Sequence, residues 1–146
     1  MSLSTLLYIV HFIGLGLSVG AATVKLTLVI RCLSDRSFVP AFNKVATTIT
    51  RLIVTGMILL AVSGITWIVM GYDFTGFLIV KIILFAFVFV LGPIIDNVAE
   101  PKLRKLAPDG GVPPSTEFVR AQKVHLMLEI VATLLFYVII VMWMFR

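Results

Sequence analysis

Charged residues and cysteine are both scarce in this sequence. Only 13% of the 146 residues are charged, whereas 60% are hydrophobic, and the mean hydropathy is +1.14. A soluble domain of this length cannot bury so much apolar surface, so the composition predicts a protein whose solvent is lipid. Cys32 is the only cysteine, which excludes an intramolecular disulfide and a multi-cysteine zinc or iron–sulfur site.

Several functional motifs are also absent from the sequence. It contains no phosphate-binding loop, nucleophile triad or metalloprotease motif. Its first residues lack the basic leader and the small-residue cleavage pattern of an ordinary signal peptide. The formal net charge of +5 does not indicate nucleic-acid binding, because the basic residues lie mostly between apolar segments, where they suit membrane topology and anionic lipid headgroups. We therefore expect the lipid bilayer as a partner and no nucleic acid.

Four long apolar segments are present, at approximately 4–30, 46–72, 74–95 and 121–145. Each is as long as the roughly 20 residues that a helix needs to cross hydrocarbon. They must be helical, because an open strand would leave unpaired backbone groups in lipid. The sequence therefore predicts one all-α domain over residues 1–146, an integral membrane four-helix bundle with up-down-up-down topology.

The basic residues predict the orientation of this bundle. The first connection holds Arg31, Arg36, Lys44 and Arg51, and the third holds Lys102, Arg104, Lys105, Arg120 and Lys123. The middle corner, Gly71-Tyr72-Asp73, has no Lys or Arg. By the positive-inside rule both basic connections face the cytoplasm and both termini face outside, an N-out/C-out arrangement. This bias and the compact size favour the bacterial inner (plasma) membrane.

Each apolar segment collects its polar or small residues on one helical face, as spacings of three, four and seven residues show. These faces comprise His11, Gly14, Ser18, Ala22 and Lys25; Thr48, Arg51, Thr55 and Ser63; Lys81, Phe85, Phe89, Gly92 and Asp96; and Gln122, His125, Glu129, Thr133 and Tyr137. Because a charge that faces lipid is costly, the four faces should meet inside the bundle.

Depth along the helices separates these residues into two layers. The inner polar network comprises Lys25, Arg51, Asp96, His125 and Glu129. Lys25–Glu129 and Arg51–Asp96 are plausible ion pairs, although the partners could be exchanged. The network could lock the helices in register, or it could carry protons with the help of His125.

The outer layer contains His11 and Lys81. His11 could be a neutral, hydrogen-bonded histidine, or it could bind haem iron, with Gly14 and Ser18 leaving room for the macrocycle. Lys81 could extend toward the headgroups or pair with Asp73, or it could hold a haem propionate or bind the iron through its amine. His11 and His125 should be about 20 Å apart along the bundle, which argues against their ligating one haem together.

The stretches HFIGLGLSVGAATVK (11–25) and FLIVKIILFAFVF (77–89) resemble the HemJ-like and CopD-like four-helix membrane proteins and related uncharacterised families. The matching features are a first helix that opens with histidine, contains glycine and ends with a basic residue, and a third helix in which lysine follows an aromatic residue and a short apolar spacer. They fall on His11, Gly14, Lys25, Phe77 and Lys81. The HemJ resemblance implies haem b at His11 and Lys81 and protoporphyrinogen-oxidase-like chemistry.

Two departures bear on that chemistry. Small residues follow His11 where HemJ proteins have an aromatic-rich run, and AQKVHLMLE (121–129) replaces their Asn-Glu-x-Pro turn. The CopD resemblance suggests copper passage, but the chain offers few copper-type ligands. The leading hypothesis is a b-type haem or porphyrin protein in electron transfer or membrane redox chemistry. The alternatives are a small metal or proton transporter and an accessory subunit of a larger membrane complex or homo-oligomer. The sequence identifies no catalytic residue.

Overall fold

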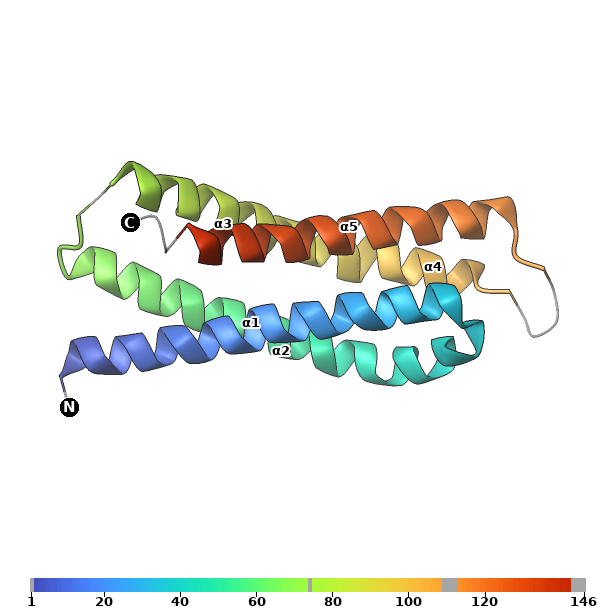
Figure 1. Ribbon diagram of the computed structural model, residues 1–146, viewed down its shortest axis with the longest axis horizontal. Coiled ribbons are helices and arrows are strands. Elements are labelled where there is room, and N and C mark those ends of the chain that lie inside the picture. Colours follow the sequence, from blue (N-terminus) through green and yellow to red (C-terminus); the bar gives the residue numbers. More distant parts are fainter. Residues whose placement is uncertain (1, 74, 109–112, 143–146) are drawn as a thin grey trace.

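The computed structural model describes residues 2–73, 75–108 and 113–142. The first residue of the predicted third segment, the last residues of the fourth and part of the third connection lie outside these ranges. The elements are α1 (Leu3–Ser34), a 3-10 turn (Arg36–Phe38), α2 (Val39–Val69), α3 (Gly76–Ile94), the π-helical segment η2 (Ile95–Ala99), α4 (Glu100–Leu106) and α5 (Thr116–Val141) (Figure 1).

Four helices are long and apolar enough to cross a membrane. They cover residues 3–34, 36–69, 76–106 and 116–141, and the third of them runs through α3, η2 and α4. Large apolar side chains such as Phe12 and Phe87 remain exposed, as lipid contact requires. The structure confirms the prediction of an all-α protein with four membrane-length helices, and the described residues contain no strand.

Short polar residues fix where the helices begin. Ser2, Thr75 and Ser115 each accept a hydrogen bond from a backbone N–H of the first turn that follows, which satisfies a donor that the helix itself leaves unpaired. Between α1 and α2, the Asp35 carboxylate accepts hydrogen bonds from both the backbone and the hydroxyl of Ser37. These bonds lower the pKa of Asp35 and keep the turn tight.

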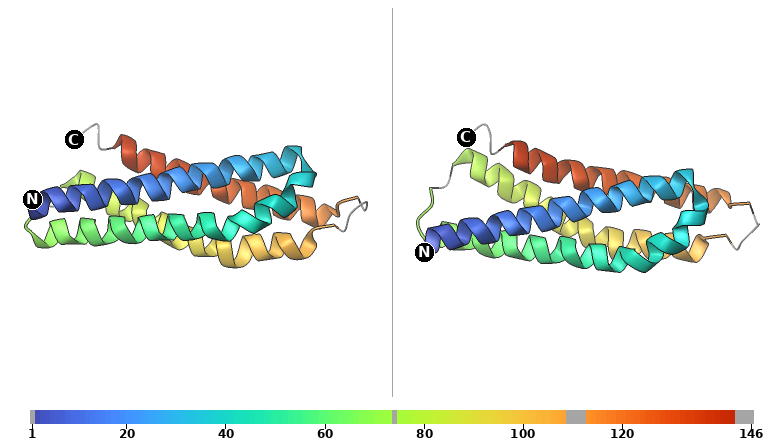
Figure 2. Two further views of the ribbon diagram at one scale, coloured as in Figure 1. Left: turned by 90° about the horizontal axis from the view of Figure 1, so that it is seen from below. Right: turned by 60° about the horizontal axis from the view of Figure 1, so that its bottom comes forward.

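The connections gather at the two ends of an elongated molecule. The α1–α2 and α4–α5 connections lie at one end and the α2–α3 connection at the other (Figure 1). We call the first the basic end, because both predicted basic connections lie there. Helix α1 packs along α2 and also against α5, and α5 packs against α3 (Figure 2).

Two apolar clusters form the core. The first lies midway along the bundle and consists of Val19, Ala22, Met57, Val88 and Phe136. The second lies nearer the basic end and consists of Val29, Cys32, Phe42 and Ala46. A layer of polar side chains lies between them.

Candidate functional site: a buried ion cluster around Lys25

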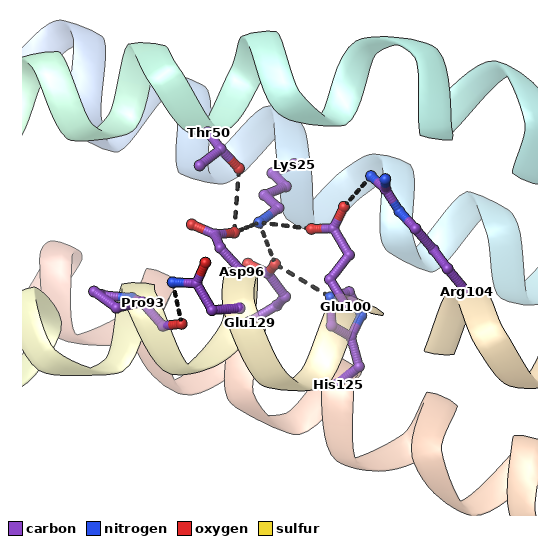
Figure 3. Close-up of polar contacts among 9 residues, drawn as sticks. Lys25, Thr50, Pro93, Asp96, Glu100, Arg104, His125 and Glu129 are labelled. Atoms are coloured by element: carbon purple, nitrogen blue, oxygen red, sulfur yellow. Dashed lines mark hydrogen bonds and ion pairs between the residues drawn. The ribbon is translucent and has the colours of Figure 1, made fainter. Parts of the chain in front are cut away.

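Lys25 is the centre of this polar layer. It lies on α1, is only 2% exposed, and directs its ammonium toward three carboxylates (Figure 3). The Nζ atom lies 2.7 Å from Asp96 Oδ1, 3.0 Å from Glu129 Oε1 and 3.5 Å from Glu100 Oε2. An ammonium has three N–H donors, so Lys25 can serve three acceptors at once. We call these four residues, with His125, the Lys25 cluster.

The break in the third long helix places two of the carboxylates. Pro93 lacks a backbone N–H, and the π-helical segment η2 begins two residues later. Asp96 lies within η2 and Glu100 begins α4, and both side chains extend toward Lys25 (Figure 3). The Thr50 hydroxyl on α2 donates to Asp96 Oδ1 at 3.2 Å. Single π-helical turns inside longer helices frequently lie at functional sites.

The charges of the cluster do not balance when every carboxyl is ionised. Arg104 donates to Glu100 and is the only cation besides Lys25 that forms an ion pair with these acids among the described residues. Three carboxylates therefore face two cations when His125 is neutral, which leaves one excess negative charge. Such a charge is costly at membrane depth, and binding one proton removes it.

His125 completes the cluster from α5. The side chain is 1% exposed, and its Nε2 lies 3.6 Å from Glu129 Oε1, too far for a hydrogen bond. Neither ring nitrogen forms a hydrogen bond with any described residue, and neither does the buried Thr133 hydroxyl one turn beyond Glu129. Buried polar groups without partners are rare in proteins and usually indicate a bound water or a functional role.

Two cavities adjoin the cluster on the side of the basic end. The larger, of about 170 Å³, is lined by Thr47, Thr50, Asp96, Glu100, Pro101 and Arg104. The smaller, of about 40 Å³, is lined by His125, Glu100 and Arg104, by Cys32, and by other side chains of α1, α2, α4 and α5. Toward the opposite end, the apolar cluster that contains Val88 and Phe136 packs against the polar layer. Both of these cavities thus lie on the side of the cluster that faces the basic end.

The structure also places His11 and Lys81 near each other, although not in a shared hydrogen bond. His11 Nδ1 lies 2.9 Å from Ser63 Oγ, and the imidazole lies 5.0 Å from the Trp67 ring. Because the Ser63 hydroxyl donates to the Leu59 carbonyl, Nδ1 carries the imidazole proton and donates to Ser63. Lys81 is half-buried, lies within electrostatic range of His11, and pairs with no described acid.

The small residues below His11, Gly14 and Ser18, pack closely against α2. A Cβ atom on Gly14 would lie 2.9 Å from the Gly56 carbonyl oxygen of α2. Ser18 is fully buried and donates to the Gly14 carbonyl at 2.8 Å. This face of α1 is covered by α2, and the expectation that Gly14 and Ser18 leave room for a macrocycle stays a prediction. The described residues also contain no group of three or more potential metal ligands.

The structure thus brings together Lys25, Asp96, His125 and Glu129 of the predicted inner network but not Arg51. The Arg51 side chain is exposed and pairs with no described acid, so the suggested Arg51–Asp96 pair is not formed. The preceding residue, Thr50, contacts Asp96 instead, because adjacent helical positions point about 100° apart. Sequence reasoning missed Glu100, although its spacing of four residues from Asp96 was a usable signal.

The arrangement of carboxylates, ammonium and imidazole can bind and release protons. Comparison with known proteins adds no further constraint: no protein-family model, no curated protein and no solved structure matches this chain.

Proposed function

We propose that this protein is a small proton-coupled transporter of a membrane, in which the Lys25 cluster binds and releases a proton in each cycle. The observation that carries this proposal is the excess of carboxylates over cations at a buried site within membrane-length helices. Ionisable residues at such depth are expensive to keep and usually mark proton or ion pathways. The proton is the simplest cargo, because a single proton removes the excess negative charge of the cluster.

The packed core favours a transporter over an open channel. The cavities that adjoin Asp96 and Glu100 lie on the side of the basic end, whereas an apolar core cluster lies toward the opposite end. Passage across the membrane would therefore require the helices to rearrange around the cluster. The π-helical turn between α3 and α4 is a suitable place for such a change, because its hydrogen bonds already depart from the regular pattern.

Proton flux into liposomes tests this function. The purified protein is reconstituted with a pH-sensitive dye inside, and a potassium gradient with valinomycin supplies the driving potential. We expect Glu129→Gln to reduce the flux about a hundredfold, the size of effect that follows the loss of a positioned proton donor or acceptor. Glu117→Gln is the matched control, because Glu117 lies on the same helix and its side chain is 63% exposed. Native flux no greater than that of empty liposomes, or equal flux in both variants, would overturn the proposal.

A second candidate function rests on His11. With Nδ1 donating to Ser63, Nε2 is unprotonated, and this is the form of imidazole that binds a metal. The HemJ-like resemblance supports a b-type haem here, with Lys81 beside it, and hence redox chemistry of the protoporphyrinogen-oxidase type. Haem would bring the electron-transfer chemistry, and His11 and Lys81 would hold it.

A visible spectrum of the purified protein, oxidised and then reduced with dithionite, tests this second function. A Soret band with sharp reduced bands that disappears in His11→Ala would support it. A colourless protein from cells supplied with haem, or an unchanged spectrum in the folded His11→Ala variant, would exclude it.

We further infer that the four membrane helices follow an up-down-up-down course with the basic end in the cytoplasm and both termini outside, in a bacterial inner membrane. The support is the gathering of both basic connections at one end of the molecule, where the positive-inside rule places the cytoplasm. In this orientation, the cavities beside the Lys25 cluster open toward the cytoplasm.

A further inference from the structure

We infer that the small cavity beside His125 binds water, and that this water passes protons between the basic end and the Lys25 cluster. The hydration site stands on the geometry of His125 and its cavity. The relay role rests on the proposed proton-coupled function. His125 would then have a function of its own, separate from the ion pairs between Lys25 and the carboxylates.

The first step concerns the imidazole nitrogens. Both are buried, and neither forms a hydrogen bond with a described residue. Leaving a buried donor or acceptor unpaired costs about 1–3 kcal/mol per group. A bound water removes this cost, because it supplies the hydrogen-bond partner that the imidazole lacks.

The second step concerns the available space. The cavity that His125 lines has a volume of about 40 Å³. One water needs about 10–15 Å³ of such volume, so the cavity can hold roughly one to three waters. Its walls are mostly apolar, and the polar side chains that contribute to them besides His125 are those of Asn43, Glu100, Arg104 and Gln122. A water there can therefore pair with the imidazole and with a further polar group, as buried waters usually do.

The third step concerns proton transfer. His125 Nε2 faces Glu129 Oε1 at 3.6 Å, and Glu129 contacts Lys25 (Figure 3). A protonated water in the cavity gives its proton to one ring nitrogen, forming the imidazolium. Nε2 then approaches Glu129 Oε1 to hydrogen-bonding distance and releases its own proton to the carboxylate, which becomes a neutral carboxylic acid. The imidazole is left as the other neutral tautomer, and a ring flip restores the starting state.

The charges beside His125 are of both signs. Lys25 and Arg104 are positive, and Asp96, Glu100 and Glu129 are negative. Lys25 lies within 4 Å of all three acids and Arg104 within 4 Å of Glu100, so two cations serve three carboxylates. An incoming proton can thus pass through His125 to the cluster, where it compensates the excess negative charge.

Solid-state NMR of the ¹⁵N-histidine-labelled protein in lipid bilayers tests the inference. The chain has only two histidines, and His11→Gln assigns their signals. We expect magnetisation transfer from water protons to a His125 ring nitrogen, although the side chain is closed to bulk solvent. Cys32→Leu fills the cavity from its wall and should reduce the transfer about tenfold, because an apolar filled site stays dry. Thr27→Leu, at an exposed position on the same helix, is the matched control and should leave it unchanged.

The outcomes separate the hydration site from the proposed function. No transfer to His125 in the native protein, or equal transfer in Cys32→Leu and native protein, would overturn the inference. If Cys32→Leu does not fold, Gln122→Leu removes a polar group from the cavity wall on α5, with the same expected loss. Water at His125 without proton flux in liposomes would retain the site and overturn the transport function. Proton flux in liposomes without water at His125 would retain the transport function and overturn the hydration site.

Discussion

Among single residues, Lys25 has the largest structural consequence, because one ammonium joins α1 to η2, α4 and α5. The Lys102–Glu117 pair provides a contrast within the same chain. Its charged atoms lie 3.6 Å apart, but the two side chains are 59% and 63% exposed. Exposed pairs contribute about 0–1 kcal/mol, whereas removing one partner of a buried pair costs about 3–5 kcal/mol.

We predict that Lys25→Met lowers the free energy of unfolding by about 3–5 kcal/mol, because three carboxylates, two of them buried, then have only Arg104 to compensate them. Lys102→Met should lower it by less than about 1 kcal/mol. Denaturant titration of both variants in detergent micelles, followed by circular dichroism, measures the difference.

A double variant provides the control for this prediction. Glu129→Gln removes one of the carboxylates that Lys25→Met leaves unpaired, so the two substitutions together should cost less than their separate effects summed. Additive effects, or equal losses in Lys25→Met and Lys102→Met, would show that Lys25 stabilises the fold only as an ordinary surface charge does.

The residue scale also shows where sequence reasoning succeeds and fails. Helical periodicity and depth suffice to bring Lys25, Asp96, His125 and Glu129 to one layer, because apolar surroundings force charges inward. They do not distinguish between adjacent positions on one helix: Thr50 contacts Asp96, whereas the next residue, Arg51, is exposed. A rotation of about 100° separates the two positions, which is smaller than the uncertainty in orienting a helix from its sequence.

Among the helices, α1 and α2 approach each other closely at two glycines, Gly14 and Gly56. A Cβ atom on Gly56 would lie 2.5 Å from the backbone nitrogen of Ser18 and 2.6 Å from the Gly14 carbonyl oxygen. Small residues at such crossings let two backbones approach, which is a main source of helix association in lipid. This contact determines how far Ser18 and the rest of the α1 polar face lie from α2.

We predict that Gly56→Ala destabilises the protein by about 1–3 kcal/mol, because the added methyl group must push α1 away from α2. Gly64→Ala is the matched control on the same helix, since nothing lies within 4 Å of its Cβ position. The control should be neutral or slightly stabilising, because alanine favours a helix over glycine by up to about 1 kcal/mol. Thermal unfolding of both variants in the same detergent measures the contrast, and equal melting temperatures would contradict the prediction.

The third long helix marks the limit of prediction at this scale. Its apolar run predicted a segment that ends at residue 95, yet helical structure continues through η2 and α4 to Leu106. Hydropathy reports the thickness of the hydrocarbon layer, whereas a helix continues for as long as its backbone can form hydrogen bonds. Pro101 near the start of α4 does not stop it, because proline fits the first turn of a helix. Glu100 lies in this extension, which is why the sequence did not reveal it.

Across the whole molecule, charge and open space coincide. The basic connections and both cavities beside the Lys25 cluster lie toward the same end, whereas the middle corner carries no Lys or Arg. The orientation in the membrane therefore also fixes the side from which protons reach the cluster. If the positive-inside rule holds here, that side is the cytoplasm.

We predict that reporters fused to the chain in a bacterial inner membrane will show this orientation. Alkaline phosphatase needs disulfides, which form outside the cytoplasm, so it should be active when fused after residue 146 and inactive when fused after residue 35. Green fluorescent protein at the same two positions provides the reciprocal control, because it should fluoresce only after residue 35. The reverse pattern would place the basic end outside, and the Lys25 cluster would then draw its protons from the external medium. Equal signals at both sites would indicate two orientations in one membrane, in which case the charge asymmetry of the connections does not determine the direction of proton entry.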